Sequence, residues 1–271
     1  MRKEMAGRLW NSFKIAFTMY SRIPVPEAKW TEENTSYAMC FFPFIGAVIG
    51  AATWGIFLLK EYLSGRGFEF GNLFFTILMV MLPVMITGGI HLDGFLDTQD
   101  ALASWQPREK RLEILKDPHA GSFAILSCGV YLLAYTGIYS ALSKDSAGVA
   151  AISFFLSRTL SGLSVLTFPQ ARKEGGGLCA SFSAHAAKKA CLAVLFGYLV
   201  ILCFVLIAAG GYAGVSCLLA AGLMYGYYYS MCIKKFGGMT GDLAGYFLQM
   251  CELFMAAAAV VTDVLVKGFG L

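Results

Sequence analysis

Three aspartates follow the second long apolar run of the chain at spacings of four and three residues. They are Asp93, Asp97 and Asp100, in the stretch TGGIHLDGFLDTQDALAS at 87–104. On a helix, residues four and seven positions apart share one face, so this spacing predicts a single stripe of carboxylates. Two carboxylates about 6 Å apart repel each other by roughly 3 kcal/mol at an effective dielectric constant of about 20. Such a stripe needs a proton or a cation.

The stripe fits either a metal site or a water-exposed helix face beside a membrane. Oxygen ligands without histidine or cysteine suit Mg²⁺ or Mn²⁺ rather than zinc. No lysine shares the stripe, and Phe95 and Ala101 help to make the other faces apolar, which favours the metal site. We therefore expect Asp93, Asp97 and Asp100 to bind Mg²⁺ and to act in catalysis.

Further polar residues lie close to these acids in the sequence. His91 stands two residues before Asp93, and as a lone histidine it fits a hydrogen-bonded interfacial residue better than a metal ligand. We include it among the substrate-binding candidates. The stretch KDPHAGS at 116–122 places Lys116, Asp117 and His119 just before the next apolar run. This stretch is either part of the site, with Asp117 as a catalytic candidate, or an ordinary turn.

A glycine-rich segment follows later in the chain, ARKEGGGLCASFS at 171–183. Arg172 and Lys173 precede Gly175 and Gly176, so free backbone N–H groups would lie beside two cations. This composition can cradle phosphate, although the segment lacks the GK[ST] of a Walker loop. The alternative is a plain flexible loop. We expect these four residues to bind substrate.

The last long apolar run opens with GGMTGDLAGYFLQMCE at 237–252, in which Asp242, Gly245, Gln249 and Glu252 recur at helical spacing. Both this stretch and the one at 88–93 place an aspartate four residues after a double glycine. Glycine pairs in membrane helices usually serve close packing or kinks. If both turns are functional, they bring Asp93 and Asp242 to one site, and Asp242 becomes a catalytic candidate.

The composition assigns these motifs to a membrane protein. The 271 residues are 58% hydrophobic and 14% charged, and the mean hydropathy is +0.65. A bilayer-spanning helix needs about 20 mainly apolar residues, and an outer-membrane barrel would show short alternating segments instead. We expect one all-α polytopic domain over 1–271 with about seven spans, near 38–59, 72–92, 122–142, 147–168, 190–210, 213–233 and 243–266.

Basic residues indicate how these spans are oriented. With the N-terminus inside, sixteen lysines and arginines fall on the inner side, and four fall outside, at Lys60, Arg66, Lys144 and Lys267. The positive-inside rule then predicts a cytoplasmic N-terminus and a cytoplasmic site. The net charge of +4 follows from these basic loops and requires no nucleic-acid partner. Arg158, the remaining basic residue, lies inside a span and needs a buried anionic partner or a polar cavity.

The N-terminal 30 residues contain aromatic side chains at helical spacing, at Trp10, Phe13, Phe17 and Tyr20. Basic residues flank them, which predicts an amphipathic helix lying in the membrane interface. The eight cysteines form no CxxC pair and no zinc spacing, so we interpret them as small core residues.

An Mg²⁺-loaded acidic site surrounded by basic and glycine-rich loops suits phosphoryl transfer, in which metal ions neutralise the charge of a pyrophosphate. The motifs GGIHLDGFLDTQDALAS, KDPHAGS, ARKEGGGL and GGMTGDLAG together resemble those of the adenosylcobinamide-GDP ribazoletransferases, or cobalamin synthases, of the bacterial inner membrane. SRIPVP at 21–26 and FFPFIGAVIG at 41–50 are also similar to the opening of that family. The likeness covers about residues 10–255.

This resemblance implies a defined reaction. A hydroxyl of α-ribazole, or of its 5′-phosphate, would attack the cobinamide-side phosphorus of adenosylcobinamide-GDP, and GMP would leave. It implies Mg²⁺ at Asp93, Asp97 and Asp100, with Asp117 and Asp242 as further ligands or the general base. Arg172 and Lys173 would meet the phosphates, and Arg158 would also belong to the substrate site. A homo-oligomer, or association with other corrinoid-pathway enzymes, stays open.

Some residues depart from the family pattern, and two other functions compete. Ala101 stands where glycine is expected, and Gln249 stands where an acid is expected. One alternative is a CDP-alcohol phosphatidyltransferase-like enzyme, whose acid spacing this chain does not match. The other is an ion-coupled transporter, whose charged residues would gather near the midplane of the membrane.

Overall fold

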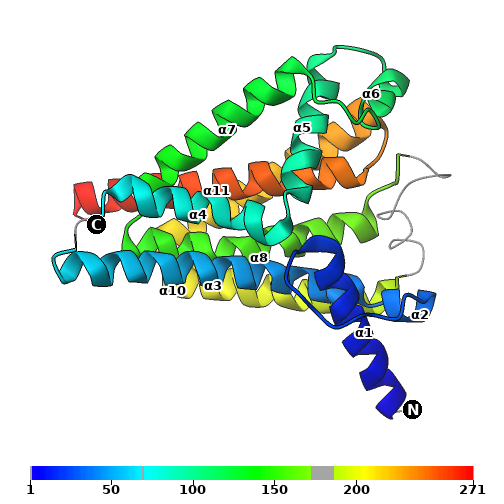
Figure 1. Cartoon of the computed structure of the whole chain (residues 1–271), viewed down its shortest axis with the longest axis horizontal. Helices are drawn as coiled ribbons and strands as arrows, with labels where there is room; N and C mark the ends of the chain where they lie inside the picture. Colours follow the sequence, from blue (N-terminus) through cyan, green and yellow to red (C-terminus); the bar gives the residue numbers. More distant parts are fainter. Residues whose placement is uncertain (1, 69, 172–185, 271) are drawn as a thin grey trace.

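The computed structural model describes residues 2–68, 70–171 and 186–270, and these residues fold into an all-helical bundle (Figure 1). Five of the helices are long and apolar enough to cross a membrane. They are α3 (Ala38–Gly65), α7 (Ser122–Ser140), α8 (Lys144–Thr167), α10 (Lys188–Met231) and α11 (Gly241–Phe269). The expected all-α membrane fold is confirmed.

The expected span at 72–92 is wrong as a single straight helix. The helix α4 (Asn72–Thr87) ends at Gly88 and Gly89, whose φ angles of 66° and 83° are left-handed. The next helix, α5 (Ile90–Ala103), leaves at 94° to α4. Figure 1 shows α5 crossing the direction of α3 and α8. We therefore treat α5 as a transverse helix outside the spanning helices.

The two expected spans at 190–210 and 213–233 form the single element α10, which contains one non-helical residue, Gly211. A straight helix of 44 residues would measure about 66 Å, twice the apolar thickness of a bilayer. The chain folds back instead, since a methyl group on Gly214 would meet the carbonyl oxygen of Leu206. Within the described residues, a count by length and composition that takes α10 as one helix gives five spans, or six with the bent α4–α5 pair, so the expected number of seven is not confirmed.

The core forms around α8, most of whose apolar window is buried. Two glycines of α3, Gly46 and Gly50, let its backbone approach α8 closely. A methyl group at Gly46 would meet the carbonyl oxygen of Phe154, and one at Gly50 would meet that of Ala151. Inside a membrane the hydrophobic effect does not drive helices together, so small residues stabilise the helix pair by allowing close van der Waals packing.

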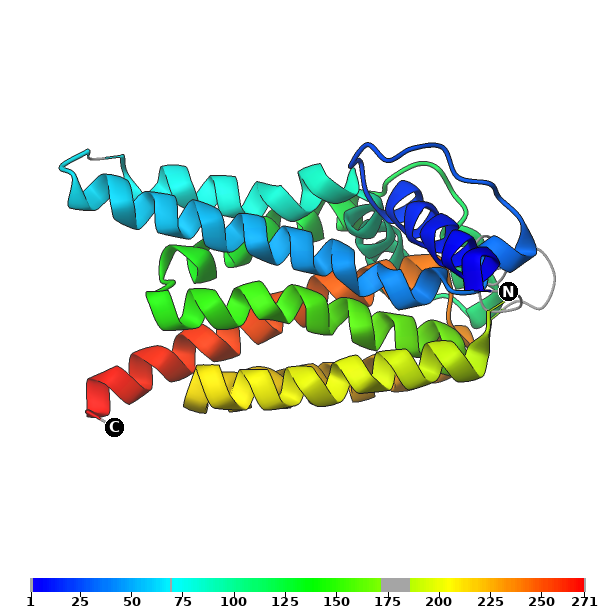
Figure 2. The same cartoon turned by 90° about the horizontal axis from the view of Figure 1, so that it is seen from below.

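Short elements gather at the end of the bundle that also holds the start of α3 and the end of α8 (Figure 2). They are α1 (Arg2–Tyr20), α2 (Glu32–Thr35), α6 (Arg108–Ile114) and the π-helical turn η1 (Cys232–Phe236). In α1, Ile15 and Phe17 are buried, whereas Trp10 is exposed. The helix thus packs partly on protein, against the start of α3, and its place in a membrane interface stays a prediction.

Arg158 has the buried anionic partner that its position in a span requires. Its guanidinium pairs with the Glu252 carboxylate of α11, and the Ser157 hydroxyl donates to the same carboxylate at 2.9 Å. Arg158 is 0% exposed and Glu252 is 1% exposed. The pair joins α8 to α11 inside the core.

Candidate active site

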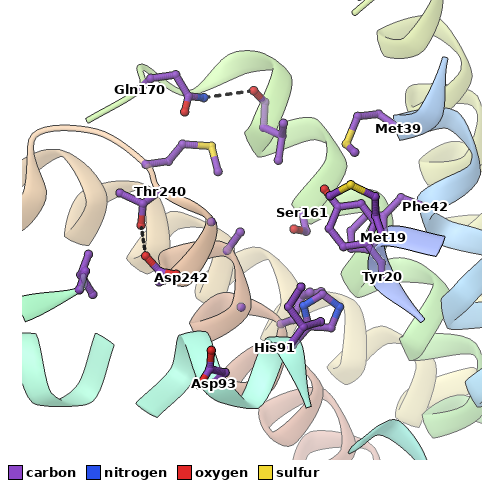
Figure 3. A pocket seen from close by; sticks show the side chains of 18 of the residues that line it. Met19, Tyr20, Met39, Phe42, His91, Asp93, Ser161, Gln170, Thr240 and Asp242 are labelled. Carbon is purple, nitrogen blue, oxygen red and sulfur yellow. Dashed lines mark hydrogen bonds between the residues drawn. The ribbon is translucent and has the colours of Figure 1, made fainter. Parts of the chain in front are cut away.

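A cavity of about 350 Å³ lies where α5, α8 and α11 meet the ends of α1 and α3 (Figure 3). Its wall includes two of the predicted acids, Asp93 and Asp242, and also His91 and Lys116. Most of the remaining wall is apolar. This volume lies at the lower end of the range for small-molecule sites, ~300–1,000 Å³.

Two glycine turns deliver the two acids to this cavity. Gly88 and Gly89 end α4, and Asp93 follows in the first turn of α5. Gly237 and Gly238, with φ angles of 71° and 155°, end η1, and Asp242 follows in the first turn of α11. These backbone angles favour glycine because it lacks a Cβ atom. The repeated glycine–aspartate spacing therefore marks two helix starts that meet at one cavity.

The acids meet because α5 and α11 cross in direct backbone contact. A methyl group at Gly94 would lie 2.8 Å from both the Cα and the carbonyl oxygen of Asp242. A methyl group at Gly245 would lie 2.9 Å from the carbonyl oxygen of His91. These two glycines thus set the distance between the helix that carries Asp93 and the one that carries Asp242.

Replacing Gly94 with alanine should therefore separate the two helices. We expect the substitution to lower the free energy of unfolding by roughly 1–3 kcal/mol, as overpacking of a tight contact does. Thermal unfolding in detergent measures the change. Gly129→Ala in α7 is the matched control, since a methyl group there meets nothing within 4 Å. Equal stability of the two variants would contradict the close crossing.

The other four predicted aspartates all act electrostatically on Asp97. Burial, and then the charges of Asp93, Asp242, Asp100 and Asp117 in decreasing order, together raise the pKa of Asp97 to about 7. Asp93 is exposed, while Asp97 and Asp100 are half-buried and Phe95 behind them is buried. The predicted stripe is therefore present on one face of α5. It lies within reach of acids from two other segments.

Asp100 has a role that the spacing did not predict. Its carboxylate accepts hydrogen bonds from the backbone N–H groups of Gly121, at 2.5 Å, and Ala124, at 2.8 Å. Gly121 is the residue before the first turn of α7, so Asp100 caps this helix from α5. A carboxylate at a helix N-terminus also interacts favourably with the helix dipole.

This capping role gives Asp100 a stability effect that Asp93 lacks. We expect Asp100→Ala to lower the free energy of unfolding by about 1–2 kcal/mol, the usual cost of a lost cap. Asp100→Asn should keep most of that stability because the amide oxygen can still accept a bond. Thermal unfolding of both variants measures this difference. If the alanine variant is as stable as the asparagine variant, the cap contributes nothing.

Asp117 and His119 form a local pair on the exposed loop before α7. The His119 ring nitrogen Nδ1 lies 2.8 Å from the Asp117 carboxylate, and the His119 backbone N–H donates to the same oxygen at 3.0 Å. These hydrogen bonds hold the pKa of Asp117 below its ordinary value. Neither residue lines the cavity, whereas their neighbour Lys116 does.

The carboxylates of the site match Mg²⁺ in their chemistry but not in their present arrangement. Over the described ranges 2–68, 70–171 and 186–270, no three Asp, Glu, His or Cys side chains stand close enough together to hold a metal ion as they are. The chemistry of the donors nevertheless fits, since Asp93 and Asp97 offer hard carboxylate oxygens. Burial is the largest cause of the raised pKa of Asp97, and four neighbouring carboxylates add to it; a cation would offset the charge of these carboxylates.

The other predicted substrate residues occupy different surroundings. His91 is buried and lines the cavity. Arg158 is not among the cavity residues, because its side chain points to Glu252. Arg172, Lys173, Gly175 and Gly176 lie outside the described residues, so their substrate contacts stay predictions.

The cavity also contains residues that the sequence reasoning missed. They come from α1, α3, α8, α11 and the turn before α11: Met19, Tyr20, Met39, Phe42, Ser161, Val165, Thr240 and Leu248. Thr240 caps α11 through the backbone N–H of Leu243 at 3.3 Å, and its place in GGMTGD could have revealed this cap. The apolar residues carry no such signal, since they are distant in sequence and typical of any membrane core.

Comparisons with known proteins decide the family. The sequence profile of cobalamin-5-phosphate synthase matches residues 12–260. The chain belongs to the cobalamin-5-phosphate synthase family. A relative named adenosylcobinamide-GDP ribazoletransferase, from Lachnoclostridium phytofermentans, is 44% identical over 96% of this chain and 97% of its own. Relatives with the same name from Desulfitobacterium hafniense and Carboxydothermus hydrogenoformans are each 31% identical over 93% of this chain, covering 96% and 97% of their own.

No solved structure matches the chain. The computed structure shows where the motifs of the cobalamin-5-phosphate synthase family lie relative to one another. The family resemblance stated from the motifs is confirmed. Of the departures from the family pattern, Ala101 is 0% exposed and only packs. Gln249 is buried and accepts a hydrogen bond from the Tyr131 hydroxyl at 2.5 Å, so this position faces α7 rather than the cavity.

Proposed function

We propose that the chain joins adenosylcobinamide-GDP to α-ribazole, or to α-ribazole 5′-phosphate, with release of GMP. The product is adenosylcobalamin or its 5′-phosphate. The observation that carries the proposal is the convergence of Asp93 and Asp242 on one cavity, with Asp97, Asp100 and Asp117 within electrostatic reach. Family membership and the shared name of the relatives support the same reaction.

In this reaction a ribazole hydroxyl loses its proton, its oxygen bonds to the cobinamide-side phosphorus, and the bond from that phosphorus to GMP breaks. A general base must lie at the cavity. Of the two candidates, Asp242 lines it and Asp117 does not, so we assign the proton to Asp242. Lys116, also in the wall, would contact a phosphate oxygen and offset its charge.

We further propose that Asp93 and Asp97 hold Mg²⁺, with Asp100 contributing from its capping position. When bound, the cation supplies positive charge for the pyrophosphate oxygens. The carboxylates lie on one face of α5. The buried residues on the opposite face of the helix hold it in position. The donor type and the excess negative charge around Asp97 support this assignment.

The dependence of the reaction on Mg²⁺ should change with pH. Because the pKa of Asp97 is raised to about 7, a proton competes with the cation below that pH. We expect the half-saturating Mg²⁺ concentration to rise up to tenfold per pH unit between pH 7 and pH 6, and to change little above pH 8. Rates of GMP release at several Mg²⁺ concentrations measure this. A constant Mg²⁺ requirement from pH 6 to pH 8 would count against Asp97 as a ligand.

The membrane side of the site is also a proposal. We propose an inner-membrane protein whose N-terminus and cavity face the cytoplasm, in contact with lipid. The excess of basic residues on the expected inner segments supports this orientation, and Lys116 of those segments lines the cavity. A membrane-impermeant thiol reagent should label Asp145→Cys from the outside and Asp117→Cys only after lysis.

The test of the reaction uses the purified full chain in lipid vesicles. With adenosylcobinamide-GDP, α-ribazole and Mg²⁺, we expect stoichiometric release of GMP and formation of the joined corrinoid. CDP-alcohol and lipid substrates should yield no product, which separates this activity from that of a phosphatidyltransferase. Ion flux without GMP release would instead support the transporter hypothesis.

A further inference from the structure

The cavity has two unlike ends. Asp93, Asp242, Thr240 and Lys116 form the polar end, and Figure 3 shows Thr240 and Asp242 joined on one side of the space. Figure 3 places Met19, Tyr20, Met39 and Phe42 on the opposite side. We call this opposite side the base pocket and define it by six residues: Met19, Tyr20, Met39, Phe42, His91 and Leu248.

His91 is the polar group of the base pocket whose surroundings are least satisfied. It is 5% exposed, and its Nε2 atom has no hydrogen-bond partner among the described residues. Its ring lies near Tyr20, with centroids 6.2 Å apart and planes at 20°, and near Phe42, with centroids 6.0 Å apart. A buried polar atom without a partner is costly, so a rotation of the ring that turns its N–H toward a ligand acceptor in the cavity is favoured.

These features suit a flat aromatic base with very few polar atoms. Thioether and aromatic side chains pack well against such rings, and a neutral imidazole has one N–H to donate. A purine such as guanine carries carbonyl, amino and ring N–H groups, and this pocket would leave most of them unpaired. A corrin ring system is too large for a cavity of about 350 Å³.

We propose that the base pocket binds the dimethylbenzimidazole base of α-ribazole and that His91 donates a hydrogen bond to its free ring nitrogen. This assignment rests on the proposed function. The base has two fused rings, apolar methyl groups and one nitrogen left free by the glycosidic bond, which matches a pocket of mainly apolar and aromatic side chains in which His91 offers an N–H. With the base seated there, its ribose points to Asp93 and Asp242 at the polar end. GMP and the corrinoid then stay outside this pocket.

The test removes the donor on one side of the proposed hydrogen bond and the acceptor on the other. The substrates are α-ribazole and the riboside of dimethylindole, in which a C–H group replaces the free ring nitrogen. The wild-type chain should show a roughly tenfold higher KM for the indole riboside. His91→Phe keeps the aromatic packing, so it should raise the KM for α-ribazole roughly tenfold and add no further loss with the indole riboside. The KM for adenosylcobinamide-GDP should not change.

Tyr139→Phe is the matched control, because it also removes a buried polar atom and lies in α7 away from the cavity. It should keep the full preference for α-ribazole. The proposal is overturned if His91→Phe keeps the preference for α-ribazole. It is also overturned if the wild-type chain shows no such preference, a result that does not depend on whether the variant folds. If wild type releases no GMP with any riboside, the proposed function itself fails. Normal release with an unchanged preference in His91→Phe rejects the base pocket alone.

Discussion

Asp93→Asn should lower the rate of GMP release roughly 10³-fold while leaving the fold intact. Asp93 is exposed to the cavity in the first turn of α5, so an amide of the same size fits without strain. The substitution removes one negative charge from the proposed Mg²⁺ site, and metal-assisted charge stabilisation contributes several kcal/mol to such reactions. Steady-state kinetics with saturating Mg²⁺ measure the loss.

The matched control is Asp145→Asn at the opposite end of the bundle. Asp145 is an exposed aspartate that pairs with Lys267 at 3.2 Å. It does not line the cavity. Its replacement should leave the rate within twofold of wild type, roughly the scatter expected of a surface substitution. If Asp93→Asn and Asp145→Asn turn over equally fast, Asp93 has no part in the reaction.

Glu252→Gln is expected to be the most destabilising single change considered. It leaves the Arg158 guanidinium buried without a negative partner. Removing one member of a buried ion pair costs about 3–5 kcal/mol, because the remaining charge is uncompensated. Thermal unfolding in detergent should show a large drop in the midpoint. Loss of α8–α11 packing should accompany it.

A charge-neutral double variant separates electrostatics from packing. Arg158→Met combined with Glu252→Gln removes both charges and should recover most of the lost stability. Glu113→Gln, which breaks the exposed pair with Lys110, should leave stability unchanged. The activity of the double variant also decides the predicted substrate role of Arg158. Full activity would assign Arg158 to structure, and a stable but inactive protein would return it to the site.

Local sequence signals predicted where the acids lie, while their roles in the reaction stay predictions. Helical spacing placed Asp93, Asp97 and Asp100 on one face, since α5 is a helix and its opposite face is buried. The repeated glycine–aspartate spacing predicted that Asp93 and Asp242 meet if both turns are functional. This pattern works because a glycine pair ends one helix and the next begins within four residues. Composition alone predicted the all-helical membrane fold.

Features that depend on tertiary contacts could not be predicted from the sequence. Hydropathy cannot show that Gly88 and Gly89 turn the chain by 94°, because both sides of the turn are apolar enough for one span. The capping of α7 by Asp100 joins residues 21 positions apart, and no local pattern encodes it. The base pocket draws on α1, α3, α5 and α11. Its apolar members look like ordinary core residues until the fold brings them beside His91.

The separate roles of Asp93 as cation ligand and Asp242 as general base can be tested directly by measuring Mn²⁺ binding with electron paramagnetic resonance. The account predicts that Asp93→Asn weakens Mn²⁺ affinity at least tenfold, since this acid holds the cation. Asp242→Asn should bind Mn²⁺ nearly as wild type does and yet lose GMP release roughly 10²–10⁴-fold, as expected for a general base. Unchanged Mn²⁺ affinity in Asp93→Asn would contradict the account at its centre.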